Sequence, residues 1–284
     1  RFATLTTQIS RRSIFTAAEV GLTLGEMGKA FGQFERVGYG LVSAQDAIDT
    51  IAKRALTLGI SGAAVMKDVQ TNMDKLNQYG FQNGIKGLAE MSMISKVFRM
   101  DMASTFTIAD QLFSPEKALE MSANLQVLGG AIGDFNDPLK LMYMATNNVE
   151  GLQDALIGAA SSLASYNTEQ KRFEISGVNL RRAREMATQL GVSYQDLSKG
   201  AIAAAERAAA ADALFSRGLT FEKDEDREFI MNIAQMKGGK MVIDIGGSPD
   251  LKKYFNSNEV ALDSLTERSE EHTSELQSLR HLVC

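Results

Sequence analysis

The chain has 284 residues, of which 44% are hydrophobic and 23% are charged, and its formal net charge is −5. These proportions are ordinary for a globular protein and exclude a chain that is disordered throughout, while the length allows one or two domains with a core. No apolar run reaches the roughly 18 residues that a membrane-spanning helix needs. Only 3 prolines accompany 24 glycines, and because helices exclude interior proline, this ratio favours a helical fold.

The two ends of the sequence need separate treatment. The chain begins with Arg1 and its first residues show no secretory signal, so we expect the natural protein to start earlier. Residues 268–284 resemble the translation of a sequencing adapter, and we expect them to be a non-native tail that contributes nothing to the fold. The tail holds His272, His281 and the single cysteine, Cys284. The rest of the chain therefore lacks the residues for disulfides, Cys/His zinc sites and histidine or cysteine catalysis.

Apolar residues recur at steps of three and four along most of the chain, which predicts helices that each bury one face. The clearest stripes run over 48–58, 66–76, 88–98, 118–128 and 180–190. Each proline follows a Ser or an Asp, in Ser114-Pro115, Asp137-Pro138 and Ser248-Pro249. This pattern is typical of a helix start, with an oxygen-bearing cap and proline at the first helical position.

Three of these helices end with similar sequences, which indicates an internal repeat. They are Leu58-Gly59-Ile60-Ser61, Leu190-Gly191-Val192-Ser193 and a degraded third version, Phe98-Arg99-Met100-Asp101. Glycine supplies the left-handed residue that ends a helix, the next aliphatic residue returns to that helix, and Ser or Asp caps the following one. We therefore predict helix–turn–helix units whose structural turn residues are Gly59, Ser61, Gly191 and Ser193.

The repeat makes a prediction about glycine replacement. Alanine at Gly59 or Gly191 should be unfavourable, because only glycine adopts the left-handed conformation freely. Gly84 and Gly87 lie near the start of the 88–98 stripe, so we expect alanine to be neutral or mildly stabilising there if their backbone angles are helical.

Two segments depart from the helical pattern. Residues 240–245, between pairs of glycines, are the best strand candidate, and residues 172–175 are a weaker one. Because a single strand leaves its backbone groups unpaired, we expect the two to pair with each other or to lie as extended covers on the helices. A further element begins at Val260, with Leu262 and Leu265.

The expected fold class is mainly α, a multi-helix array of helix–turn–helix units with one short β element near 241–245. We expect four regions along the chain. They are an N-terminal helical lead-in (1–43), a helical module with the repeated turn (44–218), a helix with a short strand and a truncated element (219–267), and the non-native tail.

Glycine-rich and acidic loops give no strong ligand signature. Residues 128–134 lack the Lys-Ser/Thr of a phosphate-binding loop and no strand precedes them, so we predict a connection between helices. Residues 245–249 could place an anion at a helix N-terminus but lack the spacing of a nucleotide-binding motif. The segment 134–138 does not fit a calcium loop, because Pro138 stands where an oxygen ligand is needed.

Clustered charges are also expected to be structural. Acidic side chains favour the first turn of a helix, where the dipole is positive, and this explains a cluster that precedes a predicted helix through Phe229, Ile233 and Met236. The cluster consists of Glu222, Asp224, Glu225 and Asp226. We predict no catalytic, cofactor-binding or metal-binding residue, and no cofactor.

The densest basic cluster is Arg181, Arg182 and Arg184. In an acidic chain it is expected to be a solvated helix face, because nucleic-acid binding requires many more cations. The neighbouring methionines 91, 93, 100 and 102 are expected to fill the core.

Several segments resemble bacteriophage tail tape measure proteins and related long phage tail structural proteins. They include residues 44–61, Ser114-Pro115-Glu116-Lys117-Ala118 with 125–130, residues 136–139, and Arg182-Ala183-Arg184-Glu185-Met186-Ala187 with 190–193. The resemblance spans about 44–245 and consists of patterns of small and apolar residues. The glycines interrupt any sustained heptad, which favours a compact module over an extended rod.

The resemblance implies a non-enzymatic helical protein in the lumen of the tail tube of the virion, present in the host cytoplasm during assembly. It also implies a role in tail assembly and length determination, contacts with tube and baseplate proteins and assembly chaperones, self-association, and no direct nucleic-acid binding. Some family members carry peptidoglycan-cleaving domains, but no such motif is present in this sequence.

Two alternatives stay open. The content of Ala, Met, Ser and Gln also suits a bacterial helical bundle that acts in signalling or secretion. The acidic cluster at 222–226 could serve a carboxylate-based hydrolase if a partner carboxylate lay across a cleft.

Overall fold

The computed structural model describes residues 13–18, 21–129, 133–216, 220–221, 224–237, 240–243 and 265–266. After a short helix over 13–18, its α-helices are α2 (Leu24–Arg36), α3 (Leu41–Thr57), α4 (Gly62–Thr71), α5 (Ile85–Val97), α6 (Met102–Leu112), α7 (Pro115–Leu128), α8 (Pro138–Asn147), α9 (Val149–Ser161), α10 (Gly177–Leu190), α11 (Tyr194–Ser216) and α12 (Asp224–Ile233). Two 3₁₀ helices, η1 (Met73–Asn77) and η2 (Gly133–Asn136), lie between them. The predicted mainly helical fold is confirmed.

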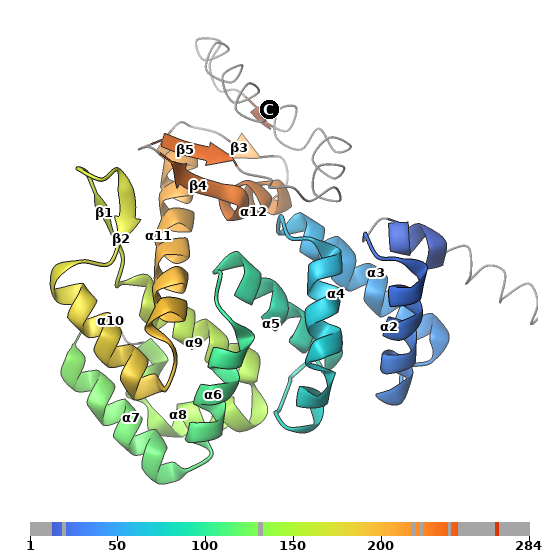
Figure 1. Ribbon diagram of the computed structural model, residues 1–284, viewed down its shortest axis with the longest axis horizontal. Coiled ribbons are helices and arrows are strands. Elements are labelled where there is room, and N and C mark those ends of the chain that lie inside the picture. Colours follow the sequence, from blue (N-terminus) through green and yellow to red (C-terminus); the bar gives the residue numbers. More distant parts are fainter. Residues whose placement is uncertain are drawn as a thin grey trace, which may run out of the picture.

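The helices follow one another across the molecule (Figure 1). Helices α2 to α4 stand at one end, α5, α6 and α9 in the middle, and α7 and α10 at the other end. The longest helix, α11, packs against α9, α10 and α12. It therefore joins elements that are far apart in the sequence.

One hydrophobic core runs through most of the described chain. It is continuous from Ala17 to Ala201 and includes fully buried large side chains such as Phe34 and Phe135. Burying such a side chain contributes about 1.5–3 kcal/mol. Methionines 91, 93, 100 and 102 are all buried, as predicted. The boundary predicted after residue 43 falls inside α3, and core residues lie on both sides of it.

Side-chain caps fix where many helices begin. Thr23 and Glu26 form a capping box at α2, with a distance of 2.8 Å from the Thr23 amide nitrogen to Glu26 Oε2. Ser114 and Asp137 cap α7 and α8, each followed by proline at the first helical position. Pro249 lies outside the described residues.

The three repeated turns share one backbone conformation. The second residue of each turn has a positive φ, which is 72° at Gly59, 55° at Arg99 and 67° at Gly191. The amide of the next residue then donates a hydrogen bond to the carbonyl of the small residue five positions earlier. The nitrogen-to-oxygen distances are 2.9 Å for Ile60 to Ala55, 2.9 Å for Met100 to Ser95 and 3.0 Å for Val192 to Ala187. The third turn keeps this geometry although it has arginine in place of glycine.

The strands form short antiparallel pairs. The predicted β element is present as β5 (Lys240–Ile243), which pairs with β4 (Ala234–Lys237). The second candidate forms β2 (Arg172–Glu174), paired with β1 (Ser165–Asn167). The two candidates do not pair with each other, so the first of the two arrangements expected for them is wrong. Each pairs with the segment beside it in sequence, because closing a short loop costs less chain entropy.

One expectation near the C-terminal end needs correction. The helix predicted through Met236 ends at Ile233, and Met236 lies in β4 opposite Met241. Leu265 belongs to a two-residue strand, β6 (Leu265–Thr266), which pairs with β3 (Thr220–Phe221). Residues 245–249 and the tail 268–284 lie outside the described residues.

The condition of helical backbone angles is met at only one of the two glycines near the start of α5. Gly84 precedes α5 with a φ of 55° rather than a helical value. Gly87 is helical, but a Cβ built there would lie 1.9 Å from Glu150 Oε1. The sequence pattern located the helix correctly, but it contained no information about the side chain of α9 that packs on it.

Candidate functional site

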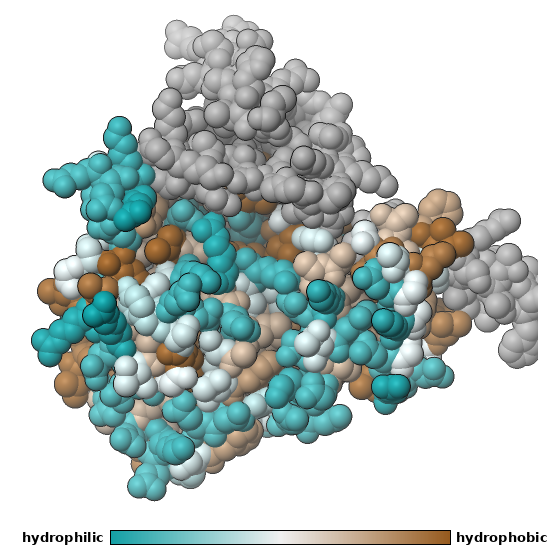
Figure 2. Space-filling view, viewed as in Figure 1, coloured by the Kyte–Doolittle hydropathy of each residue, from teal (hydrophilic) through white to brown (hydrophobic). Residues whose placement is uncertain are grey.

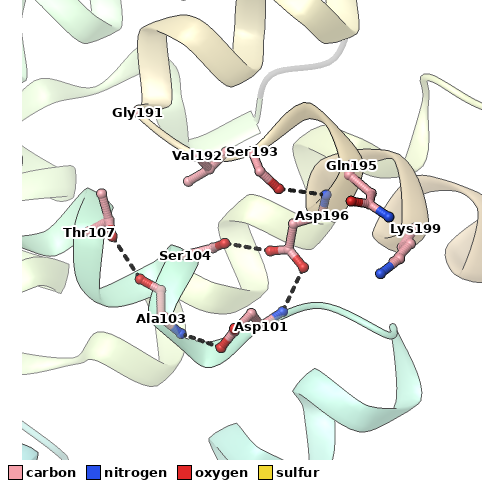
Figure 3. Close-up of a pocket in the computed structure, with 10 residues that line it drawn as sticks. All are labelled: Asp101, Ala103, Ser104, Thr107, Gly191, Val192, Ser193, Gln195, Asp196 and Lys199. Carbon is pink, nitrogen blue, oxygen red and sulfur yellow. Dashed lines mark hydrogen bonds between the residues drawn. The ribbon is translucent and has the colours of Figure 1, made fainter.

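A polar cavity of about 360 Å³ lies where α6 begins beside the start of α11. Asp101, Ser104 and Thr107 line it from the α6 side, and Ser193, Asp196 and Lys199 from the α11 side. Figure 3 shows the carboxylate of Asp196 directed at the start of α6. Two of the repeated turns, 98–101 and 190–193, therefore meet at this cavity.

Asp196 connects the two helices. Its Oδ1 accepts a hydrogen bond from the Asp101 amide at 2.8 Å, and its Oδ2 accepts one from the Ser104 hydroxyl. The Asp196 amide donates to Ser193 Oγ at 2.9 Å, which caps α11. A carboxylate at the first turn of a helix is stabilised by the helix dipole. Asp196 thus serves the N-termini of both helices.

The other hydrogen bonds at the cavity are local to α6. Asp101 Oδ1 accepts from the Ala103 amide at 2.9 Å, and Thr107 Oγ1 donates to the Ala103 carbonyl oxygen at 2.9 Å. A serine nucleophile needs an adjacent base that a third group orients. Here the Ser104 hydroxyl and the Asp196 carboxylate belong to a capping network. The arrangement stabilises a helix junction.

The turn at Gly59 packs against α12. A Cβ at Gly59 would lie 2.5 Å from Ile233 Cγ2. Asn232 Nδ2 donates to the carbonyl oxygen of Leu58 at 3.1 Å, and Arg207 Nε of α11 donates to Asn232 Oδ1 at 2.7 Å. Ser61 Oγ accepts from the Ala64 amide at 3.4 Å and caps α4.

The turn at Gly191 packs against α6 in a similar way. Gln111 Nε2 donates to the carbonyl oxygen of Leu190 at 3.1 Å, and a Cβ at Gly191 would lie 2.3 Å from that nitrogen. In both glycine turns, an amide side chain of another helix binds the carbonyl of the residue just before the glycine. Asp196 is marked locally only as the fourth residue of a Ser-x-x-Asp capping pattern that begins at Ser193, and no local sequence pattern marks Asn232 or Gln111.

The acidic residues that sequence reasoning singled out lie apart from this junction. Asp224, Glu225 and Asp226 form the first turn of α12, as predicted, and Asp226 is buried. Glu222 lies outside the described residues. Within the described segments, no three His, Cys, Asp or Glu side chains lie close enough together to hold a metal ion.

Glu150, which lies outside the acidic cluster, is a carboxylate whose pKa is shifted by its surroundings. Glu150, in the first turn of α9, accepts a hydrogen bond from the Gln82 amide at 3.2 Å. Burial raises the pKa of Glu150, the amides of Glu150, Gln82 and Asn83 act in the opposite direction, and the charge of Asp154 raises it further. Glu150 therefore holds the loop before α5 against α9.

The basic cluster on α10 is partly structural. Arg182 Nε donates to the carbonyl oxygen of Leu128 at 3.1 Å, at the C-terminal end of α7. The guanidinium of Arg184 lies 5.7 Å from the centre of the Tyr194 ring. Arg181 is exposed. The prediction of a solvated face therefore fits Arg181 but misses the role of Arg182.

In the part of the chain that the structure describes, no helix is both long and apolar enough to cross a membrane. Comparison of the chain with protein-family models, with curated proteins and with solved structures gives no match.

Proposed function

We propose that this chain is a non-enzymatic structural component of a phage tail, similar to a tape measure protein, that acts in tail assembly and length determination. The observation that carries the proposal is the use of the polar groups at the cavity. Asp196, Ser104 and Ser193 are committed to joining two helix ends. This arrangement suits a protein whose function is to keep a shape and to bind other proteins.

Exposed apolar side chains support a role in assembly. Figure 2 shows hydrophobic residues at both ends of the view, over α7 and α10 and over the N-terminal helices. Val127 and Val178 are 86% and 71% exposed at the first end, and Phe15 is 70% exposed at the second. Apolar patches on a surface mark contacts with other proteins. The partners in this proposal are tube and baseplate proteins, assembly chaperones and other copies of the chain, in the tail lumen of the virion and in the host cytoplasm.

The proposal can be tested in the phage that encodes the chain. Tails are purified and their peptides identified by mass spectrometry, and the gene is interrupted by a stop codon within α3. We expect peptides from residues 44–218 in the tails, and few tails or tails of abnormal length without the chain. Normal tails that lack these peptides would rule the proposal out. Recovery of the chain in membrane or secreted fractions of uninfected bacteria would favour the signalling or secretion alternative.

The hydrolase alternative has its own test. Purified chain is incubated with peptidoglycan, alone and with the variants Glu225→Gln and Asp226→Asn. We expect no turnover above the buffer background. Turnover that either variant abolishes would show that the acidic start of α12 is catalytic.

A further inference from the structure

The loop before α5 contains the one asparagine of the chain that is followed by glycine, Asn83-Gly84. Asn83 is exposed, and its side chain makes no hydrogen bond to any residue that the structure describes. The backbone of Asn83, by contrast, is held. Its amide is one of those that stabilise the charged Glu150 carboxylate, and its carbonyl oxygen accepts from the Lys86 amide at 3.1 Å. The side-chain amide of Asn83 is therefore free to rotate on a loop whose backbone is fixed.

The backbone nitrogen of Gly84 is open to approach. Gly84 has a φ of 55°, and apart from its two chain neighbours, a Cβ built on it would meet no atom within 4 Å. Because glycine has no Cβ, other groups can approach its backbone closely. The Gly84 amide donates to the carbonyl oxygen of Phe81 at 3.4 Å, which is long for a hydrogen bond between backbone groups. A weakly held nitrogen therefore follows an unrestrained side-chain amide.

We propose that Asn83 is a site of spontaneous deamidation. The Gly84 nitrogen attacks the side-chain carbonyl carbon of Asn83, Cγ, and forms a new C–N bond. The bond from Cγ to the side-chain nitrogen breaks, and this nitrogen takes up the proton of the Gly84 amide and leaves as ammonia. Water then adds to either carbonyl of the resulting cyclic imide and opens the ring, which leaves aspartate or isoaspartate at position 83. The two reacting groups belong to adjacent residues, so no entropy is lost in bringing them together.

Asn167, in the turn between β1 and β2, provides the contrast within the same chain. Its Oδ1 accepts from the Glu169 amide at 2.9 Å, and its Nδ2 donates to Glu174 Oε1 at 2.7 Å. The next residue is Thr168, whose branched Cβ crowds the backbone nitrogen that would have to attack. Asn167 therefore lacks both features that Asn83 combines, which are a free side chain and a following glycine.

Storage of the full chain at neutral pH and physiological temperature tests the proposal. Samples taken over several days are separated by ion exchange, and their peptides are analysed by mass spectrometry with fragmentation that distinguishes isoaspartate from aspartate. We expect a form more acidic than the starting chain, with isoaspartate at position 83, because only the imide route gives isoaspartate. The rate at Asn83 should exceed that at Asn167 by about tenfold or more, since reaction at Asn167 must first break hydrogen bonds of its side chain.

Asn83→Gln is the matched variant, because it keeps a side-chain amide but moves the amide carbon one bond further from the Gly84 nitrogen. This substitution should abolish the isoaspartate and the acidic form that carries it. A second sample, unfolded in guanidinium chloride, shows what the fold contributes. Isoaspartate at position 83 in the unfolded sample alone would overturn the proposal, since the folded loop would then protect Asn83. Equal rates at Asn83 and Asn167 in the folded chain, or an acidic form undiminished in Asn83→Gln, would overturn it as well.

Discussion

Asn232 of α12 donates a hydrogen bond to the carbonyl oxygen of Leu58, across 174 residues of sequence. Leu58 is the C-cap of α3, so this carbonyl has no hydrogen-bond partner within that helix. Gln111 binds the carbonyl of Leu190 at the end of α10 in the same manner. Two copies of the repeat thus use their helix ends as attachment points for other helices.

Replacing Asn232 with alanine should therefore destabilise the protein. The change leaves the Leu58 carbonyl without its donor and Arg207 without its acceptor, and we expect a loss of about 1–3 kcal/mol. Urea unfolding followed by circular dichroism measures this loss. Asn83→Ala, at an exposed position, is the matched control and should change stability by no more than about 0.5 kcal/mol. Equal effects of the two variants would contradict a structural role for the Asn232 side chain.

The sequence predicts features that depend on neighbouring residues, and it does not predict contacts between residues far apart in the chain. A turn is encoded by four adjacent residues, so Gly59, Ser61, Gly191 and Ser193 could be named from local rules. What each turn contacts depends on residues 79 to 174 positions away, and no periodicity encodes such distances. The candidate site could therefore not be predicted, although two of its turns were.

Arg99 shows where local rules fail. Left-handed conformation favours glycine, so arginine at this position is expected to weaken the turn. The structure keeps the turn because Glu206, far away in sequence, pairs with the guanidinium. A tertiary contact here overrides the local preference.

Glycine replacement should distinguish the turns from ordinary helix positions. Gly59→Ala and Gly191→Ala should each cost about 1–2 kcal/mol from the left-handed conformation, and Gly59→Ala should cost more because its Cβ would meet Ile233. At Gly191 the neighbour is the end of the flexible Gln111 side chain, which can move, although its hydrogen bond to the Leu190 carbonyl is then lost. A Cβ added at Gly28 in α2 would meet no atom within 4 Å, so Gly28→Ala should stabilise by about 1 kcal/mol. Stabilisation by Gly59→Ala in urea unfolding would contradict the turn geometry.

The pH dependence of stability should have opposite signs at two glutamates. The pKa of Glu150 is raised above its usual 4.5, so the folded state holds this proton more tightly than the unfolded state. Folding stability from this group is complete below about pH 4.5 and declines as the pH rises through the folded-state pKa. The pKa of Glu26 is lowered, chiefly by hydrogen bonds from Thr23. Its contribution is present above about pH 4.5 and is lost as the pH falls through the folded-state pKa.

Urea unfolding of wild-type, Glu150→Gln and Glu26→Gln protein between pH 3 and 8 checks these signs. Glu150→Gln should gain stability relative to wild type as the pH rises, because glutamine cannot ionise but still accepts from the Gln82 amide. Glu26→Gln should lose stability relative to wild type over the same rise. Parallel curves for wild type and Glu150→Gln would show that burial of the Glu150 carboxyl has no effect on its ionisation.

Gly87→Ala tests how closely α5 approaches α9. Alanine is the better helix former by about 1 kcal/mol, so a helix position free of contacts would gain stability. Here the added Cβ would lie 1.9 Å from Glu150 Oε1 and 3.5 Å from Phe81 Cβ. The carboxylate must move, and its hydrogen bond with the Gln82 amide is lost, so we expect a net cost of about 1–3 kcal/mol.

A double-mutant cycle separates this contact from a general effect on α5. In a Glu150→Ala background the carboxylate no longer lies beside Gly87, and Phe81 Cβ at 3.5 Å is at an ordinary contact distance, so Gly87→Ala should be neutral or stabilising there. The two substitutions should therefore couple by about 1 kcal/mol or more, whereas distant sites add within about 0.5 kcal/mol. Urea unfolding of the four proteins gives the coupling free energy. Additive effects would mean that α5 at Gly87 does not contact Glu150. Contacts other than those of Glu150 would then have to hold the loop before α5 against α9.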